Sequence, residues 1–117
     1  MLCTNLTDGK VARVLKNLEI DGDEKLVAFF DETVFITGSK GLLGTSKRLI
    51  KFSKKERNEY KLQDLIDIKV VEIDKQNYIY KLRIVKKDQT EVDITPKGIP
   101  NDELILLSKL LKSALKI

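Results

Sequence analysis

The spacing of apolar residues divides the chain into two helical ends and a strand-rich middle. In residues 7–18 the apolar positions recur every three or four residues, as they do on one face of a helix. These positions are Val11, Val14, Leu15 and Leu18. Residues 101–116 carry a wider leucine-rich stripe, with Asn101 as a candidate N-cap and acidic residues in the first turn, where the helix dipole favours them. The spacing predicts two helices, of which the second must cover a large apolar surface.

Residues 24–96 show the alternation of apolar and polar positions that is typical of β-strands. The clearest strand is 78–86, and its core-facing residues are predicted to be Tyr78, Tyr80, Leu82 and Ile84. In 66–73 the apolar phase changes at Val70 and Val71, which predicts a β-bulge there. Further strands are predicted at 26–30, 34–36, 48–52 and 92–94. Because the connections are short, we expect antiparallel pairing within one α+β domain, 1–117.

Three glycines, Gly38, Gly41 and Gly44, interrupt this pattern. They do not form a phosphate-binding loop, because Leu43 stands where the second glycine of that motif is required. The segment Gly-Leu-Leu-Gly also matches a loop of one RNA-binding fold, but that loop joins helices and this segment lies among predicted strands. We therefore expect a turn or a bulge here.

The same region resembles a known family. The positions that carry the resemblance are Gly41, Leu43, Thr45 or Ser46, Arg48, Leu49, Ile50 and Phe52. They resemble the pattern G-x-L-x-x-T-x-x-R-L-I-x-F of bacterial pleckstrin-homology-like (PH-like) domains. Residues 23–25 and 60–68 resemble neighbouring motifs of that family, although Lys61 or Leu62 replaces its proline.

The resemblance implies a bent antiparallel β-barrel of about six or seven strands in two orthogonal sheets. The barrel would span 24–96, the helix 101–116 would cap it, and the helix 7–18 would be an addition. Members of the family bind different lipids, peptides or one another, so the resemblance implies a scaffold and names no ligand.

Composition limits the chemistry. The chain has no histidine and one cysteine, Cys3. It therefore lacks the commonest general base and transition-metal ligand, no imidazole can activate the thiol, and no disulfide can form within the chain. No apolar run reaches the roughly 18 residues that span a bilayer, and the first residues do not resemble a signal peptide. We expect a non-catalytic protein without cofactor or metal, in the cytoplasm or peripheral at the inner membrane surface.

Positive charge is concentrated in one stretch. Residues 38–62 contain eight Lys or Arg and two Asp or Glu, whereas residues 1–37 contain four and seven. The candidate anion-binding residues are Lys40, Lys47, Arg48, Lys51, Lys54 and Lys55. Each basic residue near an anionic membrane contributes about 1 kcal/mol, and strand alternation divides these six between two faces. The stretch is therefore either a weak, salt-sensitive anion site or a solvated hairpin.

Two classes of partner remain open. The leading expectation is a protein partner or a second copy of the chain, and the alternative is an anionic lipid surface or another polyanion. Nucleic acid is disfavoured because Tyr78 and Tyr80 share a face with Leu82 and Ile84, which indicates a core position rather than a stacking surface. No small-molecule substrate is evident from the sequence.

Overall fold

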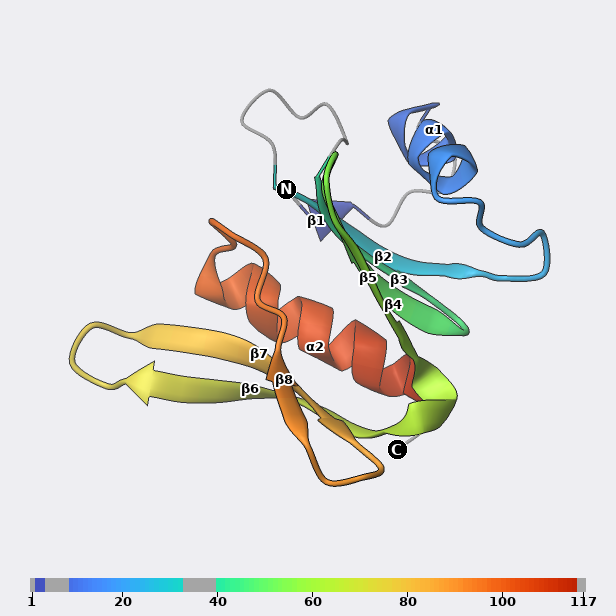
Figure 1. Ribbon diagram of the computed structural model, residues 1–117. Helices are drawn as coiled ribbons and strands as arrows, with labels where there is room; N and C mark the ends of the chain where they lie inside the picture. The colour runs from blue at the N-terminus through green and yellow to red at the C-terminus, as the bar shows by residue number, and fades with distance from the viewer. Residues whose placement is uncertain (1, 4–8, 33–39, 116–117) are drawn as a thin grey trace.

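The computed structural model describes residues 2–3, 9–32 and 40–115 as an α+β chain with two antiparallel sheets and two helices (Figure 1). The first sheet contains, in spatial order, β1 (Leu2–Cys3), β2 (Leu26–Asp31), β3 (Gly41–Thr45), β4 (Arg48–Phe52) and β5 (Arg57–Lys61). A short 3-10 helix, Leu62–Asp64, leads into the second sheet. That sheet contains β6 (Leu65–Asp74), β7 (Ile79–Lys86) and β8 (Glu91–Asp93). The helices are α1 (Gly9–Asn17) and α2 (Asn101–Leu115).

Helix α2 lies between the two sheets (Figure 1). Its core residues, Leu104, Leu107 and Leu111, are buried. They belong to one apolar cluster with residues of both sheets, namely Ala28, Leu42, Leu49, Ile68, Leu82 and Ile84. This packing confirms that the leucine-rich stripe covers a large apolar surface.

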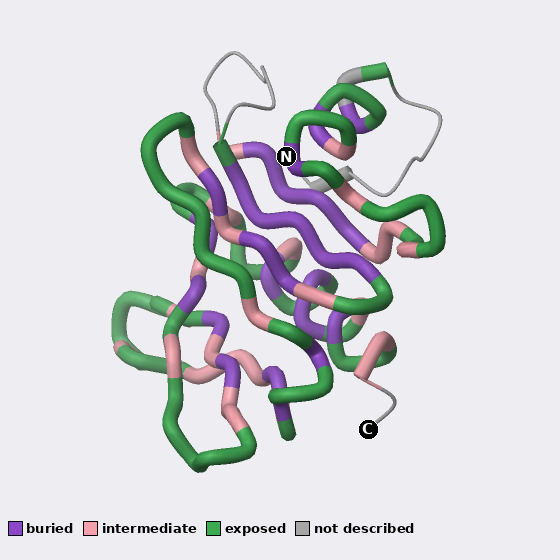
Figure 2. Tube along the Cα trace, turned by 45° about the vertical axis from the view of Figure 1, so that its right-hand side comes forward, coloured by how far each residue is buried: buried purple, intermediate pink, exposed green. Residues whose placement is uncertain are grey.

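Helix α1 packs on the other face of the first sheet. Its residues Val11, Val14 and Leu18 form a second apolar cluster with sheet residues Phe29, Leu43, Ile50 and Phe52. Because both faces of this sheet are covered, β2 and β3 are buried along most of their length, as Figure 2 shows. The predicted helix at 7–18 is therefore present, although residues 7 and 8 lie outside the described residues.

The glycines Gly41 and Gly44 lie within strand β3, so the expected turn does not occur at either of them. The β2–β3 register shifts between Leu26, which faces Thr45, and Ala28, which faces Gly44, so the pairing is irregular beside Gly44 and the extra residue lies on β2. A Cβ atom on Gly41 would lie 2.1 Å from the carbonyl oxygen of Phe30 on β2, and one on Gly44 would lie 2.3 Å from Leu111 Cδ2 on α2. The expected turn is wrong because these glycines permit close approach of neighbouring elements instead of a change in chain direction, whereas the expected bulge agrees with the shift of register beside Gly44. Gly38 lies outside the described residues.

The predicted bulge in the second sheet is also misplaced. Val70 pairs regularly with Leu82 and Val71 with Lys81, and the register shifts lie between Leu65 and Asp67 and between Glu72 and Asp74. The apolar residue Val71 shares the strand face of Lys81, which points away from the core. The change of phase in the sequence therefore reflects a partly exposed valine, not a break in pairing.

The predicted core face of 78–86 starts two residues too early, at Tyr78 instead of Tyr80. Leu82 and Ile84 are buried and Tyr80 packs against the core, but Tyr78 is 70% exposed. Tyr78 has a φ of 53° and belongs to the turn before β7, so the alternation does not extend to it.

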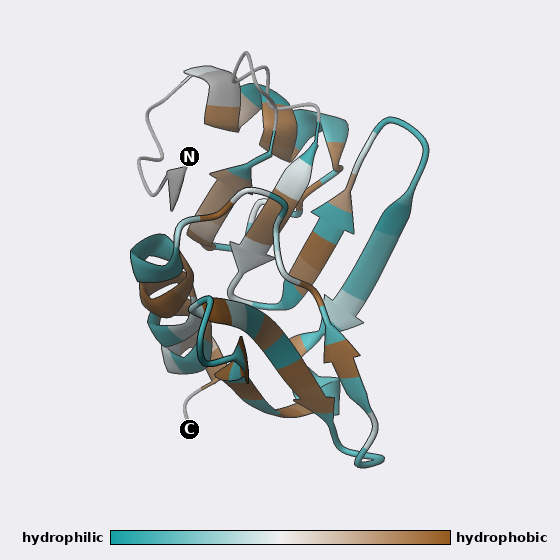
Figure 3. Cartoon of the chain, turned by 90° about the vertical axis from the view of Figure 1, so that its left-hand side faces the viewer, coloured by the Kyte–Doolittle hydropathy of each residue, from teal (hydrophilic) through white to brown (hydrophobic). Residues whose placement is uncertain are grey.

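The described residues form two antiparallel sheets, as expected, but no closed barrel. The first and second sheets form separate ladders within the described residues, and α2 occupies the space between them. Hydrophobic and hydrophilic bands alternate along the second sheet, whereas β5 is hydrophilic throughout (Figure 3). The strand predicted at 34–36 lies outside the described residues. Neither described helix is long and apolar enough to cross a membrane.

Candidate binding surface

Among the strands of the described residues, β5 is the last strand of the first sheet and pairs only with β4. Hydrogen bonds at its two ends fix which backbone groups face β4. The Leu62 N–H donates to the Lys47 carbonyl (2.9 Å), and the Ser53 N–H donates to the Glu56 carbonyl (2.8 Å). Antiparallel hydrogen bonding alternates along a strand, so the even-numbered residues of β5 bond to β4. The N–H and C=O groups of its odd-numbered residues point to the uncovered edge.

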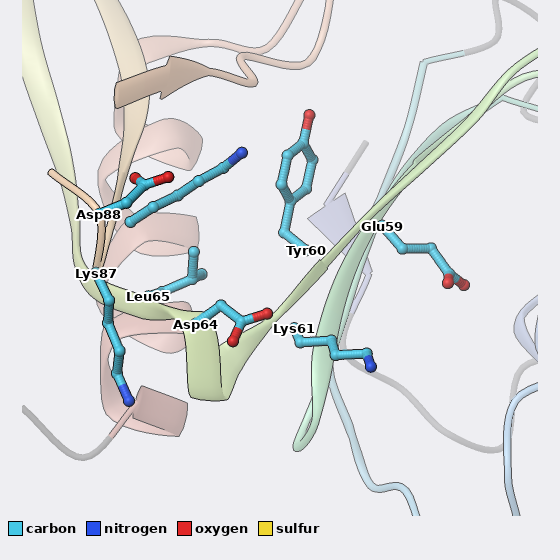
Figure 4. A pocket seen from close by; sticks show the side chains of 8 residues that line it. Glu59, Tyr60, Lys61, Asp64, Leu65, Lys87 and Asp88 are labelled. Carbon is cyan, nitrogen blue, oxygen red and sulfur yellow. The ribbon is translucent and has the colours of Figure 1, made fainter. Parts of the chain in front are cut away.

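The side chains of β5 alternate between the two faces of the sheet. Tyr60 packs against the cluster around α2, in the space between the sheets. On the opposite face, Arg57 Nη2 donates to the carbonyl of Leu18 at the end of α1 (2.8 Å). Figure 4 shows the same division, with Tyr60 on one side of β5 and Glu59 and Lys61 on the other. Partner side chains can therefore meet different chemistry on the two faces of this edge.

A hollow of about 470 Å³ lies beside Tyr60, between β5 and the beginning of the second sheet (Figure 4). Leu65 and the Tyr60 ring provide its apolar surface, and Lys86 Nζ lies 5.7 Å from the centre of that ring. The charged lining residues are Glu59, Lys61, Asp64, Lys86, Lys87 and Asp88. A small apolar surface is thus surrounded by ionic side chains.

The carboxylates of this hollow are largely satisfied by the protein, whereas the lysines are not. Glu59 accepts hydrogen bonds from Arg48 (2.6 Å) and Arg57 (3.0 Å). Hydrogen bonds from the Thr90 hydroxyl and N–H lower the pKa of Asp88. Within the described residues, the three lysines that line the hollow form no ion pair, and among its carboxylates the same holds for Asp64 and Asp88. The hollow therefore offers a local excess of unpaired positive charge.

The predicted anion ligands Lys47 and Arg48 are engaged within the protein. Lys47 pairs with Asp23 at the surface. Arg48 donates to both carboxylate oxygens of Glu24 at 2.9 and 3.2 Å, and the Thr45 hydroxyl donates to the same group at 2.5 Å. The Glu24 side chain is 1% exposed. Burial would raise the pKa of Glu24, but the hydrogen bonds from Thr45 and Arg48 outweigh burial, and the pKa is lowered.

Arg48 also helps to hold the C-terminal end of α1. Its Nη2 lies 3.4 Å from the carbonyl oxygen of Glu19, beside the Arg57 contact with Leu18. Glu19 has a φ of 56° and its N–H donates to the carbonyl of Lys16, which closes the helix as a C-terminal cap. Cationic guanidinium groups are stabilising at this end of a helix. These contacts assign Arg48 a structural role.

Two other predicted ligands, Lys40 and Lys51, meet at Glu32. Their Nζ atoms lie 3.9 and 3.3 Å from its carboxylate, whose side chain is 1% exposed. The N–H of Lys97 donates to the same carboxylate, and Lys97 lines the same hollow of about 360 Å³. Sequence reasoning missed Lys97 because it lies 65 residues from Glu32 along the chain, and no local pattern joins the two.

The structure does not bring the six predicted anion ligands together. Lys54 and Lys55 are exposed in the connection between β4 and β5 and form no ion pair within the described residues. Lys40 and Lys51 lie at Glu32, and Lys47 and Arg48 lie near the end of α1. The stretch thus supplies three separate groups, and anion binding by any of them stays a prediction.

No family model, curated protein or solved structure matches this chain. In the part of the chain that the structure describes, no group of three or more Cys, Asp or Glu side chains could hold a metal ion. The surface around β5 is therefore the feature of the molecule that bears on function.

Proposed function

We propose that this chain is a non-catalytic binding module of PH-like architecture and that its ligand is another protein chain. The order of elements supports the architecture: β2 to β5 form one sheet, β6 to β8 form another, and α2 follows. This is the order that the sequence resemblance implies, with β1 and α1 added at the N-terminal side. The PH-like scaffold is compatible with many ligands, so the choice of a protein ligand depends on the surface.

The observation that carries the proposal is the exposed edge of β5 beside a hollow with a partly apolar floor. An unpaired strand edge is a template for pairing with another chain. Tyrosine and arginine are enriched at protein interfaces, and β5 contains one of each within five residues. These features favour recognition of polypeptide over recognition of a small molecule.

Site-specific photocrosslinking in the host cell tests the proposal. A photoreactive phenylalanine analogue at Asn58, on the same face of β5 as Tyr60 and in the lining of the hollow at Glu32, is expected to form discrete adducts with protein. The same analogue at Lys109, on the exposed side of α2, serves as the control. Light scattering of the purified chain then distinguishes a second copy from a different partner. Absence of any protein adduct from position 58 would contradict the proposal.

A second candidate function, binding of an anionic lipid surface or another polyanion, is supported by one observation. Lys40, Lys51 and Lys97 line the same hollow, and Glu32 and Glu56 are its acidic lining residues. Phosphatidylglycerol vesicles should then sediment the protein at low salt and release it at high salt.

A double variant, Lys51→Gln with Lys97→Gln, should abolish this sedimentation. The matched control is Lys54→Gln with Lys55→Gln, which removes equal charge from the exposed connection. Equal sedimentation of the wild type and both variants would count against the Glu32 hollow as the lipid site.

A further inference from the structure

We propose that β5 binds an extended, acidic segment of a partner protein, which adds to the first sheet as an antiparallel strand. This inference rests on the proposed protein-binding function and specifies its ligand class and geometry. Three independent features of the surface carry it: the backbone groups of β5, the hollows on its two sides, and the charge around them.

Within the part of the chain that the structure describes, the backbone of β5 presents a regular set of hydrogen-bonding groups that pair with no other strand. Arg57, Glu59 and Lys61 direct their N–H and C=O groups away from β4, as the alternation of the β4–β5 ladder requires. Such groups recur about every 6.8 Å along a strand, at every second residue. An antiparallel segment can therefore form a ladder over the full length of β5.

Hollows on both sides of β5 provide room for the side chains of an added strand. The inner hollow contains Tyr60 and Leu65, and an outer hollow of about 590 Å³ contains Arg48 and Leu62. Glu59 and Lys61 line both hollows, so β5 forms the ridge between them. Because side chains alternate along a strand, those of an added segment would enter the two hollows in turn.

Among the described residues, three lysines of the inner hollow (Lys61, Lys86 and Lys87) and two carboxylates (Asp64 and Asp88) form no ion pair, and this excess of one positive charge favours an acidic segment. Lys86 and Lys87 form no ion pair within the described residues, and they lie beside the position that an inward-facing partner side chain would occupy. On the outer side, Lys61 is likewise without an ion pair in the described part of the chain. An aspartate or glutamate at alternating positions would meet these cations, and such cross-strand pairs stabilise a sheet.

The same pattern disfavours pairing of β5 with a second copy of the chain in the register that joins all five residues of the strand. If β5 paired with itself around its central residue, Glu59 would face Glu59 of the second copy. In that two-fold arrangement Arg57 would face Lys61 of the second copy. Like charges directly opposite one another destabilise an antiparallel pair. A different chain with acidic residues avoids both conflicts.

The test uses the full chain and a fluorescein-labelled synthetic peptide in which glutamate alternates with valine. A peptide that alternates lysine with valine is the charge control. Fluorescence anisotropy at low salt should show binding of the acidic peptide only. Amide hydrogen exchange measured by NMR should slow at Arg57, Glu59 and Lys61 when the acidic peptide binds. Protection that appears on another element, with none at these three amides, would overturn the inference.

A proline substitution isolates the backbone contribution. Lys61 has a φ of −69°, which proline adopts, and its N–H points away from β4. Lys61→Pro therefore removes one edge donor without breaking the β4–β5 ladder, and Lys61→Ala removes the same charge but keeps the donor. We expect Lys61→Pro to bind the acidic peptide about threefold to tenfold more weakly than Lys61→Ala. Equal affinities of the two variants would contradict strand addition.

A second variant keeps the inference testable if Lys61→Pro is poorly folded. Lys86→Gln with Lys87→Gln leaves β5 unchanged and should weaken binding of the acidic peptide and reduce its salt dependence. Unchanged binding would show that the ligand does not need to be acidic.

If the acidic peptide does not bind while crosslinks from position 58 persist, this inference fails and the protein-binding function stands. If both are absent, both fail. If the chain self-associates and Lys61→Pro abolishes this self-association, the ligand of β5 is a second copy of the chain and not a segment of a partner protein.

Discussion

Arg48 and Glu24 form the main buried ionic contact at the end of α1. The Glu24 carboxylate is almost completely buried, and two nitrogens of Arg48 and the Thr45 hydroxyl donate to it. Removing one partner of such a pair leaves a charge in an environment that solvates it poorly. The neighbouring pair of Lys47 and Asp23 is exposed, so water can replace either partner.

We predict that Arg48→Met lowers the free energy of unfolding by about 2–4 kcal/mol, because Glu24 loses its cation but stays buried. Lys47→Met is the matched control, since it also removes one positive charge from β3–β4, and it should leave the free energy of unfolding nearly unchanged. Urea denaturation of both variants measures the difference. Equal effects of the two substitutions would show that the buried contact has no special role.

The lowered pKa of Glu24 predicts a pH dependence of stability. Its ordinary value is 4.5, and the folded protein binds the proton less readily than the unfolded chain does. The contribution of Glu24 to stability is therefore fully present above about pH 4.5 and is lost as the pH falls through the lowered pKa. Urea denaturation across this range should show a shallower loss of stability for Glu24→Gln than for the wild type. Parallel curves for the two proteins would contradict the assignment.

The strands and helices meet through close contacts that composition alone does not reveal. Strand β3 approaches β2 at Gly41 and α2 at Gly44. Helix α1 has nine residues, too few for a stable helix in isolation, so its stability comes from packing on the sheet and from the contacts at its C-terminal end. Periodicity predicted both helices because each has one apolar face. It could not predict which neighbour each glycine would meet.

We predict a graded response to alanine at three glycines. Gly41→Ala should be the most destabilising, because the new Cβ atom would collide with backbone of β2. Gly44→Ala meets the side chain of Leu111, which can shift, and should cost about 1–3 kcal/mol. Gly22→Ala should be nearly neutral, since no atom lies within 4 Å of its added Cβ. The melting temperatures of the three variants, measured by thermal unfolding, give the order of destabilisation. A different order would refute the account of β3.

For the whole molecule, the sequence predicted the α+β class, both helices and most strands, since these follow from local spacing. Contacts between distant segments were not predictable in the same way. Glu24 and Arg48 lie 24 residues apart. The local sequence pattern therefore does not show that Arg48, a predicted anion ligand, forms an ion pair within the protein. Alternation predicts Tyr78 in the core, but the left-handed backbone conformation of Tyr78 interrupts that alternation. The β5 surface was missed because its hollow joins Tyr60 to Lys86 and Lys87 from another sheet.

An open edge of β5 that can accept another chain is the feature on which the proposed function depends. Residue-by-residue hydrogen exchange of the unbound protein, followed by NMR, tests it most directly. We predict slow exchange at the amides of Asn58 and Tyr60, which bond to β4, and fast exchange at those of Arg57, Glu59 and Lys61. Uniform protection along β5 in the monomeric protein would show that the edge is already covered and would contradict the account.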